Sequence, residues 1–127
     1  MKARLILVFL LVSICGYSQV TNLLYEKSKA VLNCFETNNF AGLSKYFDDT
    51  MNKGLPANKA KEVWDLLNQQ AGPYIKSTTI SDTSFQGYQI VYIICIFQNS
   101  TLKMKTVFDK NEKVAGLYFV PENAPKP

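Results

Sequence analysis

The stretch "GYQIVYIICIF", Gly87–Phe97, decides the fold because it is apolar at almost every position. Its β-branched and aromatic residues predict a strand, and the near absence of polar alternation indicates that both faces of this strand are covered. We therefore expect it to lie centrally in a sheet. The patterns on either side of it predict three more strands, joined by short polar turns: Tyr74–Thr83, Thr101–Asp109 and Lys113–Val120.

Helical periodicity precedes the strands. Between residues 22 and 37, apolar side chains recur at the spacing of one amphipathic helix. The segment "NNFAGLSKYFDD", residues 38–49, predicts a shorter second helix, and a third is expected from Pro56 until Gly72 and Pro73. The order predicts an α+β domain, with about three N-terminal helices packed on an antiparallel sheet of about four strands.

The last part of the chain, "VFDKNEKVAGLYFVP" (Val107–Pro121), predicts the hairpin that closes the sheet. Gly116 within its second strand suggests a bulge or bend. Pro121 has no amide proton and is expected to end the pairing. Residues 122–127, "ENAPKP", then form a Pro-rich C-terminal tail that we expect to be extended and solvated.

The N-terminus has the pattern of a secretory signal peptide. Lys2 and Arg4 precede the ten-residue apolar run Leu5–Ile14, and small and polar residues follow it. A ten-residue helix is about 15 Å long, half of a bilayer core, so we expect no stable membrane span after cleavage. Cleavage near Gln19 would leave residues 19–121 as one domain.

Secretion or release to the periplasm is therefore the expected localisation. Lipidation at Cys15 is a weaker alternative, because Ile14 stands where a small residue is needed.

Missing residue types exclude several functions. The chain has no histidine, and Arg4 is its one arginine. The absence of guanidinium groups beyond the signal argues against nucleic-acid binding. Triads and imidazole metal sites need histidine, so we expect no enzyme of those classes, no metal and no cofactor. Cys34 and Cys95 are interpreted as buried thiols, with a disulfide and a reactive thiol as alternatives.

Three segments together carry a resemblance to a known family. They are "FDDTMNKGLPANKAKEVWDLLNQQAG", "GYQIVYIICIF" and "LKMKTVFDKNEKVAGLYFVP". In this order and spacing they resemble the bacterial family named domain of unknown function 3887. The resemblance implies the nuclear-transport-factor-2-like fold, also called SnoaL-like or ketosteroid-isomerase-like, a cone closed by helices over a curved sheet. It also implies an association with hydrolase domains, which often follow this domain in one secreted chain.

The mouth of such a cone is where the resemblance places ligands. Aromatic side chains expected to face inward are candidates for its lining, and four are predicted to bind ligand: Trp64, Tyr88, Tyr92 and Phe108. Phe47 and Tyr118 are further candidates. For each of these six aromatics, a place in the core is the competing interpretation.

We expect a non-catalytic module that binds a small apolar ligand or peptide, or docks on a separate hydrolase. A homodimerising interaction module is one alternative. The other is an isomerase-like or dehydratase-like enzyme using an aspartate, Asp48, Asp49 or Asp65, with a tyrosine.

Overall fold

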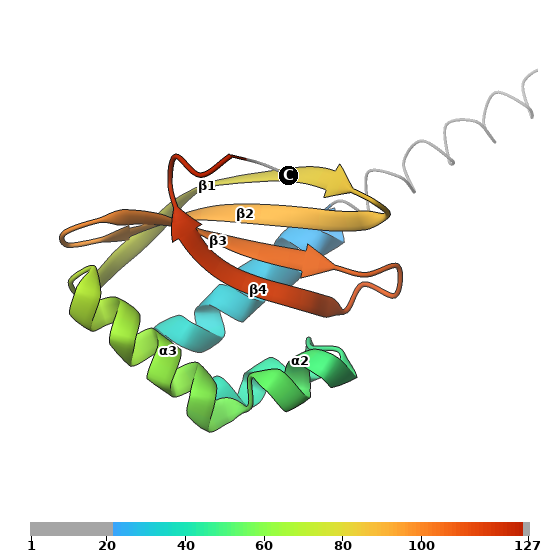
Figure 1. Cartoon of the computed structure of the whole chain (residues 1–127), viewed down its shortest axis with the longest axis horizontal. Helices are drawn as coiled ribbons and strands as arrows, with labels where there is room; N and C mark the ends of the chain where they lie inside the picture. The colour runs from blue at the N-terminus through green and yellow to red at the C-terminus, as the bar shows by residue number, and fades with distance from the viewer. Residues whose placement is uncertain (1–21, 126–127) are drawn as a thin grey trace, which may run out of the picture.

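The computed structural model of the chain describes residues 22–125 and confirms an α+β fold. The predicted signal peptide, with Cys15, lies outside the described residues. Helices occupy the first half of the described chain and four strands the second half (Figure 1). No helix within residues 22–125 has the length and apolar character needed to cross a bilayer.

The helical half differs from the prediction at one point. The N-terminal helix spans residues 22–36, and α3 (Ala57–Gln70) ends before Gly72, whose φ of +84° is the left-handed conformation that closes many helices. Within the segment predicted as the second helix, residues 38–49, the structure has the 3-10 helix η1 (Phe40–Lys45). A further helix that was not predicted, α2 (Asp49–Gly54), begins where that segment ends.

Two contacts explain why η1 ends early and why α2 begins at Asp49. Phe47 forms an isolated parallel bridge with Val114, which requires an extended residue between the two helices. Asp48 then begins α2, since its Oδ1 accepts a hydrogen bond from the backbone N–H of Met51 at 2.7 Å.

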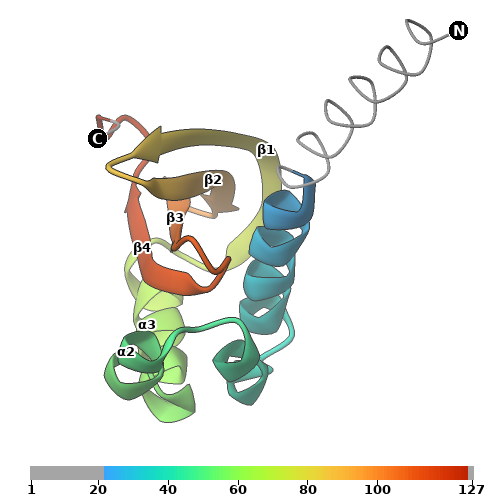
Figure 2. The same cartoon turned by 90° about the vertical axis from the view of Figure 1, so that its right-hand side faces the viewer.

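The sheet is an antiparallel meander in the order β1-β2-β3-β4. The central position predicted for the apolar run is confirmed, because β2 lies between β1 and β3. Figure 2 shows the sheet strongly curved, with β1 beside the N-terminal helix and β4 above α2 and α3. The strands are β1 (Tyr74–Phe85), β2 (Tyr88–Phe97), β3 (Thr101–Phe108) and β4 (Val114–Pro121).

Bulges interrupt the two edge strands. In β4, Val107 pairs with Gly116 and Phe108 with Val114, so Ala115 is the extra residue, beside the glycine that suggested a bulge. In β1, two residues separate Ser77 from Ile80, whereas one residue separates their partners in β2. Extra residues of this kind bend a strand and increase its twist.

The core lies between the helices and one face of the sheet, which we call the inner face. Its centre is a set of five rings, the aromatic cluster: Phe35, Trp64, Tyr74, Phe97 and Phe119. The Trp64 ring centroid lies 5.3–6.0 Å from those of the other four. At these separations aromatic pairs contribute beyond their buried area, so Trp64 links α3, the N-terminal helix and three strands.

The closing hairpin is confirmed, but the tail after it differs from the prediction. Leu117 and Phe119 pack against the core, and Pro121 is the last paired residue. The chain then turns back instead of extending, with the N–H of Ala124 donating to the carbonyl oxygen of Pro121 at 3.0 Å. Lys103 Nζ donates to the carbonyl oxygen of Ala124 at 3.2 Å, which holds this turn on the sheet.

Candidate functional site

The four aromatic residues predicted to bind ligand do not come together in the fold. Trp64 and Phe108 are buried on the inner side, within the core. Tyr88 and Tyr92 project from the opposite, outer face of β2, because side chains alternate along a strand and the core contacts come from Val91 and its alternate neighbours. The expectation that both tyrosines face inward is therefore wrong.

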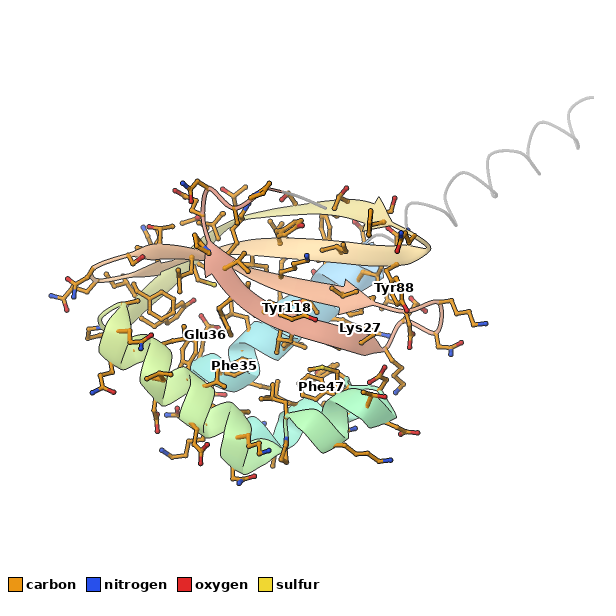
Figure 3. The ribbon with its side chains drawn as sticks, viewed as in Figure 1. Lys27, Phe35, Glu36, Phe47, Tyr88 and Tyr118 are labelled. Atoms are coloured by element: carbon orange, nitrogen blue, oxygen red, sulfur yellow. The ribbon has the colours of Figure 1, made fainter. Side chains whose placement is uncertain are left out.

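The outer face of the sheet has aromatic and cationic side chains together. Lys103 Nζ lies 5.1 Å from the centroid of the Tyr92 ring, and Lys105 Nζ lies 5.8 Å from that of Tyr118. Tyr92 is only 3% exposed, whereas Tyr88 is 44% and Tyr118 is 54% exposed. Figure 3 shows Tyr88 and Tyr118 on the sheet and Phe35 and Phe47 between the sheet and the helices.

None of the three aspartates considered for catalysis lies in the core. Asp48 caps α2 and is partly buried, and Asp49, in the first turn of α2, is exposed. Asp65 is paired with Lys61 on the exposed side of α3, with 2.6 Å between Lys61 Nζ and its Oδ2. These positions give no aspartate facing an interior tyrosine.

Both cysteines in the described part of the chain are free and buried. Burial raises the pKa of the Cys95 thiol to about 12 and raises that of Cys34 as well. A reactive thiol needs a lowered pKa and access to solvent, so these two behave as small apolar side chains.

A cleft opens between the N-terminal helix and β1. Its volume is about 340 Å³, within the range of pockets that hold small ligands. One wall is the helix, the other is the bulged part of β1, and the floor is apolar. The residues lining it are Lys29, Leu32, Asn33, Glu36, Ser77, Thr78, Ile80 and Ile93, and we call it the helix–β1 cleft.

Two hydrogen bonds between tyrosine and carboxylate join helix and strand around the cleft. The hydroxyl of Tyr74, where β1 begins, donates to Glu36 Oε2 at 2.6 Å. The hydroxyl of Tyr25 on the helix donates to Asp82 Oδ1, near the end of β1, at 2.5 Å. Burial, and then the bond to Glu36, raises the pKa of Tyr74, and the bond to Asp82 raises that of Tyr25. Both hydroxyls therefore remain protonated donors at neutral pH.

The β1 bulge explains why the cleft is open between these two bonds. Between Ser77 and Ile80 the strand carries one residue more than β2 does. That residue has no partner residue in β2, so the local backbone departs from the regular ladder. The cleft consequently combines hydroxyls, an amide, a cation and a carboxylate at its rim with aliphatic side chains below. Such an arrangement can hold an amphiphilic molecule.

Comparison with protein families gives one match. Residues 28–117 match the family described as "Protein of unknown function (DUF3887)". The chain belongs to this family. No curated protein and no solved structure matches it. The matched DUF3887 segment contains every residue that lines the helix–β1 cleft and excludes the turn after Pro121.

In this DUF3887 chain, a second depression lies between α3 and β4. It measures about 180 Å³, and its lining is entirely apolar: Phe35, Leu55, Val63, Leu67, Leu117 and Phe119. Several of these side chains already pack on the core. Within residues 22–125 no three histidine, cysteine, aspartate or glutamate side chains gather as metal ligands would. The helix–β1 cleft has the more varied chemistry of the two and is our candidate site.

Sequence reasoning missed the cleft of this DUF3887 chain for two reasons. Lys29, Asn33 and Glu36 recur at helical spacing, which is also the pattern of a solvated helix face. The bulge between Ser77 and Ile80 contains two threonines and no glycine or proline, so it leaves no turn signal in the sequence. Only the pairing of helix and strand brings these groups together.

Proposed function

We propose that this chain is a secreted or periplasmic, non-catalytic module that binds a small ligand or peptide in the helix–β1 cleft. The observation that carries the proposal is the composition of that cleft, with charged and polar groups at the rim and aliphatic side chains at the floor. Pockets for small ligands commonly combine an apolar lining with a few convergent polar groups that fix orientation.

The proposal includes the nuclear-transport-factor-2-like fold. A strongly curved antiparallel sheet with helices on one face supports this assignment (Figure 2). The aromatic cluster occupies the centre of the layer between the sheet and the helices, so we place the ligand at the edge of that layer, beside β1.

Localisation rests on the signal-like N-terminus. We expect the mature chain to begin within a few residues of Gln19. Intact-mass measurement on protein recovered from the periplasm or medium tests this directly. An uncleaved or diacylglyceryl-modified chain would contradict it.

Native mass spectrometry of protein purified from its own compartment tests the binding function. We expect a bound ligand in the natural protein and its loss in Asn33→Trp, which places an indole in the cleft. Asn58→Trp, at an exposed position on α3, is the matched control and should keep the ligand. Retention of the ligand by Asn33→Trp would place its site elsewhere.

If native mass spectrometry shows no ligand on the natural protein, a second measurement is needed. A fragment mixture is then added, and the backbone amide resonances of residues 29–36 and 77–80 are followed by NMR. If no compound shifts them, the binding proposal is wrong.

The outer face of the sheet supports a second candidate, a homodimerising interaction module. Three large aromatic side chains there are at least 44% exposed: Phe85, Tyr88 and Tyr118. Light scattering would give the mass in solution, and Tyr118→Asp should dissociate a dimer formed through this face. A monomer at all concentrations would exclude this candidate.

A further inference from the structure

The helical wall of the cleft carries opposite charges at its two ends. Lys29 and Glu36 both line the cleft and stand seven residues apart. At 1.5 Å per residue this is about 10.5 Å along the helix axis. An extended chain of three residues spans about 10–11 Å. The wall therefore matches a ligand with an anionic group at one end and a cationic group at the other, separated by about the length of a tripeptide.

The middle of the cleft suits a peptide backbone. Asn33 lies between the two charges on the helix and has an amide that both donates and accepts hydrogen bonds. Ser77 and Thr78 add hydroxyls from the opposite wall, at the bulge where β1 has one residue more than its partner strand. The backbone of an extended peptide alternates hydrogen-bond donors and acceptors and could therefore bond to both walls. One of its side chains would then point to the floor of the cleft.

The floor restricts that side chain. Leu32, Ile80 and Ile93 form it, and all three are aliphatic. Burial of apolar surface against them favours an aliphatic side chain in the middle of the ligand. A single amino acid could not reach both charges, because its own charged groups lie within one residue length.

The direction in which the peptide lies in the cleft follows from the direction of the helix. Glu36 belongs to the last turn of the N-terminal helix, where the free carbonyl groups favour a cation. The peptide's amino group thus belongs at Glu36 and its carboxylate at Lys29. Tyr74, at the start of β1, is bonded to Glu36, so the peptide would run parallel to β1 and antiparallel to the helix.

Resting on the proposed binding function, we infer that the ligand of the helix–β1 cleft is a free peptide of about three residues with an aliphatic central side chain. Its ammonium group pairs with Glu36 and its carboxylate with Lys29.

Both charges are available for these contacts. Tyr74 donates to Oε2 of Glu36, and Oε1 of the same carboxylate faces the ammonium group in our proposal. Lys29 contacts Glu26 at 3.4 Å, and both side chains are more than half exposed, at 57% and 71%. A pair of this kind is weak, so a ligand carboxylate can replace it.

Isothermal titration with four peptides tests the inference. The probes are Ala-Leu-Ala, its N-acetyl form, its C-terminal amide and the dipeptide Ala-Leu. We expect Ala-Leu-Ala to bind, and each modification that removes a charge to weaken binding by up to about fivefold, as expected for a lost ion pair at an exposed site. The dipeptide should bind no more tightly than the two capped peptides, because it is too short to contact Lys29 and Glu36 at the same time.

Variants assign each end of the peptide. Lys29→Gln should weaken the binding of Ala-Leu-Ala by up to about fivefold and make binding insensitive to C-terminal amidation. Glu36→Gln should do the same for N-acetylation, while its amide oxygen can still accept from Tyr74. Lys61→Gln, on the exposed side of α3, is the control and should bind as the natural chain does. Melting temperatures of all three verify that they are folded.

The outcomes separate this inference from the proposed function. Equal affinity for free and capped peptides, or unchanged sensitivity in Lys29→Gln and Glu36→Gln, would overturn the peptide assignment. If no tripeptide binds while a co-purified ligand or fragment shifts the amide resonances of the cleft, the inference fails and the binding function stands. If neither perturbs the cleft, both fail.

Discussion

The aromatic cluster and the helix–β1 cleft occupy the same layer, between the helices and the inner face of the sheet, yet one is full and the other open. At the cluster, five rings from the N-terminal helix, α3 and three strands fill the space. At the cleft, a bulged strand and a helix meet through two tyrosine–carboxylate hydrogen bonds and leave about 340 Å³ between them. The aromatic cluster is therefore expected to contribute most of the packing energy, whereas the helix–β1 cleft has the space for a ligand.

Tyr74 belongs to both regions. Its ring packs in the cluster at 5.3 Å from Trp64, and its hydroxyl bonds Glu36 at the cleft. Substitutions that remove packing from the cluster should be costly, whereas those that alter the cleft should be tolerated. Four measurements test this contrast.

The largest effect is expected from Trp64→Ala. Trp64 is 6% exposed, and deleting a large buried aromatic costs about 3–5 kcal/mol of unfolding free energy. In a domain of this size that loss can prevent folding, so Trp64→Phe, which keeps part of the ring contact, is measured beside it by urea denaturation. A loss below about 1 kcal/mol for Trp64→Ala would mean that the cluster does not dominate stability.

The second-largest effect is expected from alkaline pH, which should lower the free energy of unfolding through the buried Cys95 thiol. Burial raises the pKa of the Cys95 thiol from 9.0 to about 12. Above pH 9 the unfolded chain loses this proton and the folded chain keeps it. The stabilising contribution is therefore complete below pH 9 and declines until about pH 12. The slope is about half of 1.4 kcal/mol per pH unit at pH 9 and approaches about 1.4 kcal/mol per pH unit above it.

Cys95→Val should reduce this slope, measured by urea denaturation at pH 8, 9 and 10. The window ends at pH 10 because Tyr25 and Tyr74, whose pKa values are also raised, contribute above it. An unchanged slope in Cys95→Val would show that the thiol is accessible to solvent.

Tyr74→Phe should have an intermediate effect, because it keeps the ring in the cluster and removes only the hydroxyl. The lost hydrogen bond to Glu36 should cost about 1 kcal/mol. Tyr25→Phe is the matched change at the other hydrogen bond. It should cost less, since burial is the main cause of the raised pKa of Tyr74 but not of Tyr25. Equal losses would indicate that the two hydroxyls are equally hydrated.

The smallest effect is expected from deleting residues 122–127. The deletion removes the hydrogen bond from Lys103 to the carbonyl oxygen of Ala124, and residues 122, 123 and 125 are exposed, so the cost should stay below about 1 kcal/mol. Lys103→Met removes the same donor in the full chain and also the contact with the Tyr92 ring, so its cost should be at least that of the deletion. A fall of the melting temperature by more than a few degrees on deletion would show that the tail contributes to the fold.

Much of the fold was predictable because periodicity is local. The amphipathic pattern located the N-terminal helix and α3, and the strand boundaries differ from the prediction by one or two residues. The second helix was wrong because Phe47 pairs with Val114, a contact between residues distant in the chain. The candidate site was largely unpredictable. Lys29 and Thr78 look like ordinary surface residues until a helix and a bulged strand bring them to one cleft.

By itself, the sequence determined that the chain is α+β and that the apolar run lies in the middle of the sheet. These conclusions follow from composition and from periods of a few residues. Tertiary structure alone decided which face of β2 meets the helices. Both faces of this strand are apolar, so alternation could not place Tyr88 and Tyr92, and the outer position of these tyrosines depends on pairing and packing. The cleft likewise arises from the β1 bulge, a property of two paired strands that neither strand encodes alone.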